Sequence, residues 1–99
     1  MMTHKDLKVW QKAMQLVTLL YNCTKSFPKE EIFGLVSQMR RSAVSIPSNI
    51  AEGYGRMSNK ELVHFLYISL GSASELEIQL IIAKNLNFMA DKNLSNFTN

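Results

Sequence analysis

The residues that could do chemistry are few, and they are not spaced as in catalytic or metal-binding sites. The two histidines, His4 and His64, lie far apart, and neither has a second histidine or a cysteine at ligand spacing. We therefore expect no metal site. The single cysteine, Cys23, cannot form an internal disulfide and lies in an apolar helical stripe, so we interpret it as a packing residue.

Two short series come closer to the patterns of catalytic sites. Ser42, Ser45 and Ser48 recur at every third position around Pro47, but no base is placed to activate a serine. These hydroxyls are expected to bond to backbone carbonyls beside the proline. A glutamate, a histidine and a tyrosine at positions 61, 64 and 67 are better explained as a capping, a surface and an interface residue. The sequence thus predicts no enzyme activity and no cofactor.

A basic stripe marks the first predicted helix. Lys5, Lys8 and Lys12 follow one another at i, i+3 and i+7, and Arg56 and Lys60 form a second small cluster. Eleven Lys and Arg against eight Asp and Glu give a net charge of +3. Such a stripe is usually a solvated face, but it can also follow phosphates. We hypothesise weak, sequence-tolerant binding of RNA or DNA; the alternative is a structural or protein-interaction adaptor without nucleic-acid binding.

A set of polar residues on the second and third predicted helices is expected to form a structural network. Glu75 lies close to the apolar seam of its helix, where a carboxylate is costly unless it is paired. Arg40 or Arg41 is its expected partner, within one chain or between chains, and Glu52 is expected to take the other arginine. The predicted network comprises Arg40, Arg41, Ser45, Ser48, Asn49, Glu52 and Glu75.

Apolar residues at 3/4 spacing predict the first two helices. The first runs over residues 5–26 and ends at Phe27-Pro28, because the residue before proline is pushed out of the helical region. The second begins between residues 29 and 33. Its pattern continues in register past Pro47, which predicts a kinked but continuous helix that Gly53 and Gly55 end.

The third helix is predicted from a capping box, 58–61, to about residue 87, and a short fourth helix is predicted to start at residue 90 or 91. The chain is therefore expected to be an all-α, up-and-down helical bundle whose fourth helix is short or missing. Two apolar rows on each of the first and third helices exceed what such a core can cover, which predicts a homo-oligomer. The candidate interface residues are Tyr67, Leu70, Ile78 and Ile81.

Length and composition bound the class of protein. The 99 residues make one domain, 1–99, and no uninterrupted apolar run approaches the roughly 18 residues of a membrane span. The first six residues lack the apolar core of a signal peptide, so we expect a cytoplasmic protein with no membrane association.

Three blocks of the sequence resemble a known family, the four-helix bundle proteins encoded in intervening sequences of bacterial 23S rRNA genes. The blocks are 6–13 with 27–31, 40–53, and 65–80. The resemblance implies a non-catalytic bundle that assembles as a ring, typically a homopentamer. A related branch, the accessory proteins of diversity-generating retroelements, implies nucleic acid and a reverse transcriptase as possible partners. Family members have a longer fourth helix than the predicted one here.

Overall fold

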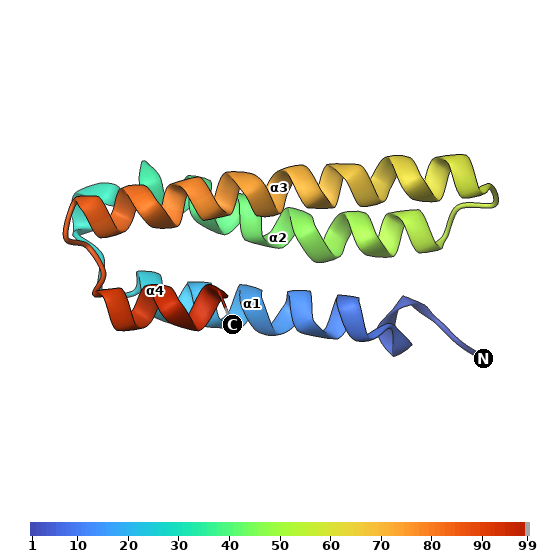
Figure 1. Cartoon of the computed structure of the whole chain (residues 1–99), viewed down its shortest axis with the longest axis horizontal. Helices are drawn as coiled ribbons and strands as arrows, with labels where there is room; N and C mark the ends of the chain where they lie inside the picture. Colours follow the sequence, from blue (N-terminus) through green and yellow to red (C-terminus); the bar gives the residue numbers. More distant parts are fainter. Residues whose placement is uncertain (99) are drawn as a thin grey trace.

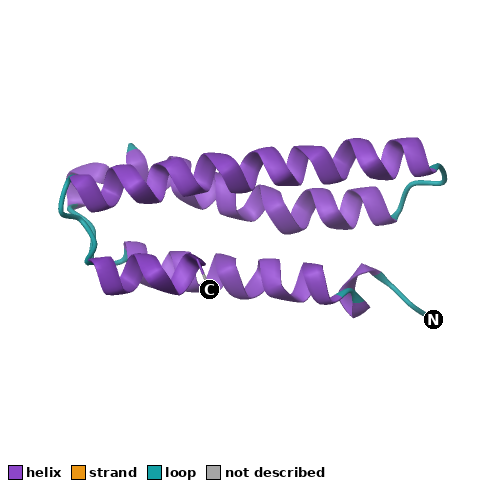
Figure 2. Ribbon diagram, in the orientation of Figure 1, coloured by secondary structure: helices purple, strands orange, loops and turns teal. Residues whose placement is uncertain are grey.

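The fold consists of helices joined by short turns. The computed structural model describes residues 1–98, and for Thr98 the backbone only; Asn99, the last residue of the predicted domain, lies outside the described residues. Residues 1–98 contain no strand (Figure 2). The elements are η1 (His4–Asp6), α1 (Lys8–Thr24), η2 (Lys29–Glu31), α2 (Leu35–Tyr54), α3 (Asn59–Asn85) and α4 (Asp91–Thr98).

The helices form an elongated up-and-down bundle of 44 × 20 × 20 Å. α2 packs against α1 on one side and against α3 on the other, and consecutive helices run in opposite directions (Figure 1). The short α4 contacts α3 and lies beside the C-terminal half of α1, with which it lines a shallow pocket. The predicted all-α bundle with a short fourth helix is confirmed.

The start of α3 carries only half of the predicted capping box, because Glu61 Oε2 accepts from the Ser58 hydroxyl at 3.4 Å and not from the Ser58 backbone N–H. The hydroxyl of Ser58 accepts a hydrogen bond from the backbone N–H of Glu61 at 3.2 Å, which caps the first turn. At the other end Asn87 has a φ of 62°, and the N–H of Phe88 donates to the carbonyl of Ala83 at 2.9 Å. This 6→1 bond is the Schellman motif that ends helices with a left-handed residue.

The second helix starts later than predicted. Lys29–Glu31 forms a separate 3-10 turn, and α2 begins only at Leu35, whose N–H donates to Oε1 of Glu31 at 3.2 Å. The helix then runs through Pro47 without a break, as predicted. Beside the proline, the Ser48 hydroxyl donates to the carbonyl of Val44 at 2.8 Å, which confirms the expected bond to backbone for this serine.

Gly53 does not end the second helix, contrary to the prediction. It is buried inside α2, and only Gly55 lies at the C-cap. A Cβ atom at Gly53 would lie 3.0 Å from the Cβ of Phe65 and 3.3 Å from the carbonyl oxygen of Leu62. The missing side chain therefore lets α2 and α3 approach closely.

We expect Gly53→Ala to lower the free energy of unfolding by about 1 kcal/mol. Overpacking costs about 1–3 kcal/mol, and the better helix propensity of alanine offsets about 1 kcal/mol of that cost. Gly71→Ala is the matched control in α3, because a Cβ there meets no atom within 4 Å; this variant should gain about 0.5–1 kcal/mol. Urea unfolding of both variants measures the difference, and equal effects would contradict the close approach.

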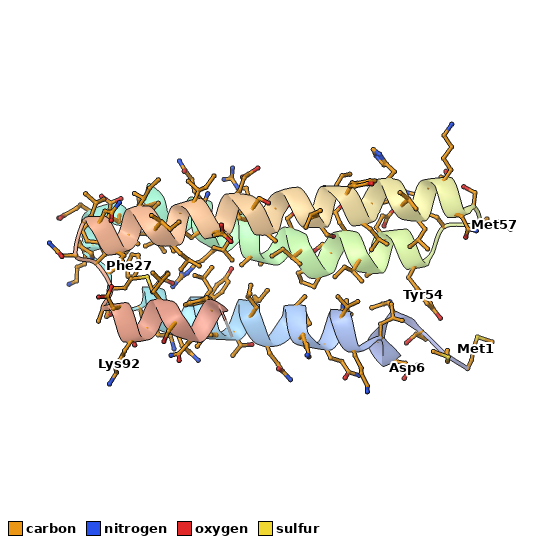
Figure 3. All side chains as sticks on the ribbon, viewed as in Figure 1. Met1, Asp6, Phe27, Tyr54, Met57 and Lys92 are labelled. Atoms are coloured by element: carbon orange, nitrogen blue, oxygen red, sulfur yellow. The ribbon has the colours of Figure 1, made fainter. Side chains whose placement is uncertain are left out.

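The apolar core occupies the half of the bundle that α4 covers. Its buried members come from α1, α2, α3 and the two turns at that end: Leu20, Phe27, Val36, Met39, Ala43, Leu76, Leu80, Ala83 and Met89. Leu94 and Phe97 of α4 pack against this core. Figure 3 shows Phe27 at this end and Tyr54 and Met57 at the opposite end, which α4 does not reach. The bundle thus has four helices around the core at one end and three helices at the other.

Candidate functional site

More exposed large apolar side chains lie on α3 than on any other described helix. The exposed fraction is 68% for Tyr67, 62% for Leu70, 58% for Ile78 and 45% for Ile81. We name these four residues the outer face of α3. On the opposite side of the helix, Leu76 and Leu80 are buried in the core. Because α3 is apolar around its circumference and α2 covers one side, most of its apolar residues face outward.

An apolar groove begins where α4 ends. Its cavity measures about 550 Å³ and is lined from α1 to α4 by Leu16, Ile46, Ala73, Leu76, Glu77, Leu80, Ile81, Leu94 and Phe97. Ile81 belongs both to this groove and to the outer face of α3. The exposed apolar surface therefore continues from the outer face into the bundle.

By length and composition alone, α3 is long and apolar enough to cross a membrane. A single helix of this kind is weak evidence, since helices from protein cores pass the same test. α3 carries Glu75 and Glu77 near its middle. A charge at the bilayer centre costs about 2.5–3.5 kcal/mol, so these glutamates favour an aqueous or protein-covered setting for α3.

The predicted basic residues lie at the end of the bundle that α4 does not reach. Lys5, Lys8 and Lys12 are exposed on η1 and α1, and within residues 1–98 none of them forms an ion pair. Arg56 differs, because its guanidinium pairs with Glu52 and stacks over the ring of Phe65 at 4.8 Å. Lys60 is exposed on the first turn of α3. The two clusters thus share one end of the molecule but stand on different helices.

Arg40 joins α1 to α2 and does not contact Glu75. Its Nε donates to the hydroxyl of Thr24 at 3.1 Å, and its Nη2 donates to the carbonyl of Tyr21 at 3.5 Å. The guanidinium also lies 4.5 Å from the centre of the Tyr21 ring. A cation at the last turn of a helix is favourable because the free carbonyls there carry partial negative charge.

Within one chain, the two ion pairs predicted for the polar network do not form, and the alternative of a pair between chains stays a prediction. Within the described residues Glu75 pairs with neither arginine, and its carboxylate accepts one long bond of 3.5 Å from the Ser42 hydroxyl. Glu52 pairs with Arg56, which lies just beyond the C-cap of α2, rather than with an arginine at positions 40 or 41. An ion pair between residues i and i+4 forms within one segment of the chain. It therefore does not depend on how α2 packs against the other helices.

Of the remaining members of the network, Ser48 is exposed and bonds to the α2 backbone, whereas Arg41, Ser45 and Asn49 lie beside α3 or bond to a residue that does. Asn49 Nδ2 donates to the carbonyl of Ser45 at 2.8 Å and to its hydroxyl at 3.0 Å, and Ser72 of α3 donates to the same hydroxyl at 2.8 Å. Beside them runs a polar cavity of about 370 Å³. We name it the α2–α3 cleft; it is lined by Gln38, Arg41, Ser42, Ser45, Ser72, Glu75 and Gln79.

Comparison with known families decides what kind of bundle this is. The family model described as 23S rRNA-intervening sequence protein matches residues 5–99, which include all four helices. The chain belongs to this family. No curated protein matches it. The resemblance carried by the three sequence blocks is thus confirmed over nearly the whole chain.

In this member of the 23S rRNA-intervening sequence protein family, three of the seven residues that line the cleft were not predicted from the sequence. Gln38, Ser72 and Gln79 were not among the predicted residues. A signal was present, because Gln38, Ser42 and Ser45 follow one another at helical spacing, as do Ser72, Glu75 and Gln79. The polar rows of two neighbouring helices in an up-and-down bundle can face each other, and here they do.

In this family member, the two histidines pack against aromatic rings and the cysteine packs against the core. The His4 ring packs edge-on against Trp10 at 5.1 Å, and the His64 ring packs against Phe65 at 5.3 Å. Among the described residues no group of three His, Cys, Asp or Glu side chains could hold a metal ion. Cys23 packs against the core.

Cys23 should react slowly with alkylating agents. Burial raises the pKa of its thiol above the ordinary value, and only the thiolate is nucleophilic. At pH 8 we expect iodoacetamide to modify the folded chain severalfold more slowly than the chain in denaturant. The rate for the folded chain should rise at a higher pH than the rate for the unfolded chain. Equal rates and equal pH profiles would contradict this placement of the thiol.

Proposed function

We propose that this family member is a non-catalytic assembly protein that self-associates through the outer face of α3. The observation that carries the proposal is the exposure of four large apolar side chains on one helix, Tyr67, Leu70, Ile78 and Ile81. Exposed apolar side chains that gather on one face of a protein mark contact sites. The groove at the end of α4 extends the same surface.

The energetic requirement for association agrees with the size of this face. Burying one large apolar side chain contributes about 1.5–3 kcal/mol, and association costs about 4–15 kcal/mol in lost freedom. One such residue is therefore too few, whereas four residues with the adjoining groove reach the necessary range. Two copies related by a two-fold axis or a closed ring would both cover the face. The family resemblance favours five copies.

Sedimentation equilibrium of the chain at micromolar concentration tests self-association. The proposal predicts a mass that is a multiple of the 11.3 kDa of one chain. Dilution should lower the average mass in steps that fit a reversible equilibrium. A mass of one chain at all concentrations up to about 100 µM would exclude association of useful strength, since weaker binding corresponds to less than about 5.5 kcal/mol.

A second candidate function, weak binding of RNA or DNA, is supported by the basic stripe on η1 and α1. Lys5, Lys8 and Lys12 are exposed, and within residues 1–98 no carboxylate neutralises them. The ammonium groups of Lys8 and Lys12, one turn apart on α1, can neutralise successive phosphates, and Lys5 adds a third charge from η1. Assembly would multiply the stripe, so that individually weak contacts add through multivalency. Arg56 and Lys60 would extend it, with the charge of Arg56 shared with Glu52.

Binding measured at 50 and 200 mM salt tests this second function. Each phosphate contact adds about −0.9 to the slope of log K against log salt concentration on duplex DNA. Replacing Lys8 and Lys12 by glutamate should therefore weaken binding and flatten the slope by about 2. The matched control replaces Lys29 and Lys92 by glutamate, which changes the net charge equally at other sites; Lys92 points away from the bundle (Figure 3). Equal loss in both variants would indicate a general charge effect only.

A further inference from the structure

The α2–α3 cleft offers hydrogen-bonding groups that the protein itself leaves unused. Within residues 1–98 the guanidinium of Arg41 makes no hydrogen bond and no ion pair. The amide oxygen Oε1 of Gln79 is buried and has no hydrogen-bond partner. A buried acceptor without a donor costs free energy comparable to a lost hydrogen bond. The cleft is therefore incomplete as a purely structural network.

The serines of the cleft retain one free proton. The Ser45 hydroxyl accepts from Asn49 Nδ2, which can only donate, and it shares a second bond with the Ser72 hydroxyl. The two serine hydroxyls have two protons, and the bond between the hydroxyls uses one of them. The other proton can be donated to an acceptor in the cleft. Glu75 likewise keeps most of its acceptor capacity, since its one bond, from Ser42, is 3.5 Å long.

The charges of the cleft select the kind of group that can fill it. Arg41 comes from α2 and Glu75 from α3, so a cation and an anion line the same cavity without being paired to each other. A simple anion would be attracted by Arg41 and repelled by Glu75. A simple cation would be attracted by Glu75 and repelled by Arg41. A small molecule that carries both a negative and a positive charge can pair with Arg41 and with Glu75 at the same time.

We infer that the α2–α3 cleft binds a small zwitterion of the α-amino acid class. The ligand carboxylate would accept two parallel bonds from the Arg41 guanidinium, the geometry in which arginine binds carboxylates best. The ligand ammonium has three N–H donors, and the Glu75 carboxylate, which keeps most of its acceptor capacity, can accept from it. The cavity of about 370 Å³ accommodates a molecule of this size. This site does not depend on self-association or on nucleic-acid binding.

Nuclear magnetic resonance of the side-chain amides of Gln38 and Gln79 tests the site, because both residues line the cleft. The probe is L-alanine, and the comparison compounds are propionate, which lacks the ammonium, and ethylamine, which lacks the carboxylate. L-Alanine should shift the two amide signals in a saturable manner below about 50 mM, the range expected for so few ligand atoms. Neither propionate nor ethylamine should reproduce this saturation.

Two variants with matched controls locate the binding groups. Arg41→Gln and Glu75→Gln should each weaken the binding of L-alanine at least about 10-fold. Arg56→Gln and Glu77→Gln remove the same charges outside the cleft and should leave binding unchanged. Three results would overturn the inference: no saturable shift with L-alanine, an equal response to propionate or ethylamine, or full binding in the Arg41 and Glu75 variants. Circular dichroism of each variant verifies that the helices are retained.

Discussion

Replacing Leu70 and Ile78 together by glutamate is expected to dissociate the proposed assembly into single chains of 11.3 kDa. These side chains are two of the most exposed apolar residues on the outer face of α3. Each replacement removes about 1.5–3 kcal/mol of apolar burial from the contact and places a carboxylate where water is excluded. Association should weaken at least about 100-fold, which corresponds to about 2.7 kcal/mol.

The control for this variant carries the same two charges elsewhere. Ile32 and Phe33 are exposed apolar residues beside the turn between α1 and α2, remote in sequence from α3. Their replacement by glutamate should leave the assembly intact. Light scattering coupled to gel filtration measures both variants, and urea unfolding shows whether the chain still folds. If the control variant dissociates and the α3 variant does not, the contact between chains does not use the outer face of α3.

Leu20→Ala is expected to lower the free energy of unfolding by about 2–5 kcal/mol, the largest stability effect of any substitution considered. Leu20 has an exposed fraction of 0%, and it packs in the core with Met39 and Leu80. The substitution removes apolar burial and leaves a cavity, and both terms destabilise. Small domains have only about 5–15 kcal/mol of stability, so this loss is a large share of the total.

Leu86→Ala is the matched control, since Leu86 is exposed at the end of α3. Removing an exposed side chain usually changes stability by less than about 0.5 kcal/mol. Thermal and urea unfolding compare the two variants. A similar effect of both substitutions would mean that the core does not lie at the end of the bundle that α4 covers.

The helices were largely predictable because their signals are local. The spacing of apolar residues, the Ser58 cap and the left-handed Asn87 each depend on a few neighbouring positions. The late start of α2 was not predictable in this way. The N-cap residue of α2 is Gly34, which has no side chain to cap the first N–H groups. Instead, the carboxylate of Glu31, from the preceding 3-10 turn, accepts a hydrogen bond from the N–H of Leu35.

Contacts between helices were less predictable, because they depend on how far each helix is rotated about its axis. Arg40 and Arg41 are adjacent in sequence and project about 100° apart around α2. One consequently reaches back to Thr24 of α1, and the other lines the cleft with α3. From the sequence, both arginines are candidate partners of Glu75. No local signal shows which of the two faces α1 and which faces α3.

Gly53 illustrates the same limit. A glycine near the end of an apolar pattern usually stops a helix, and this expectation is wrong here because Phe65 and Leu62 of α3 occupy the space beside it. Only the packing of α2 on α3 distinguishes a glycine that ends a helix from one that admits a neighbour. The exposed outer face of α3 was easier to anticipate, since an excess of apolar residues is visible in the sequence alone.

The accessibility of isoleucine methyl groups is the measurement that tests the central proposal most directly. A soluble paramagnetic chelate broadens the methyl signals that it can reach, and the exposed fractions of Ile78, at 58%, and Ile32, at 51%, are similar within one chain. At high protein concentration the proposal predicts that Ile78 is protected, that Ile32 remains accessible, and that dilution exposes Ile78 again. Equal broadening of both residues at every concentration would contradict self-association through the outer face of α3.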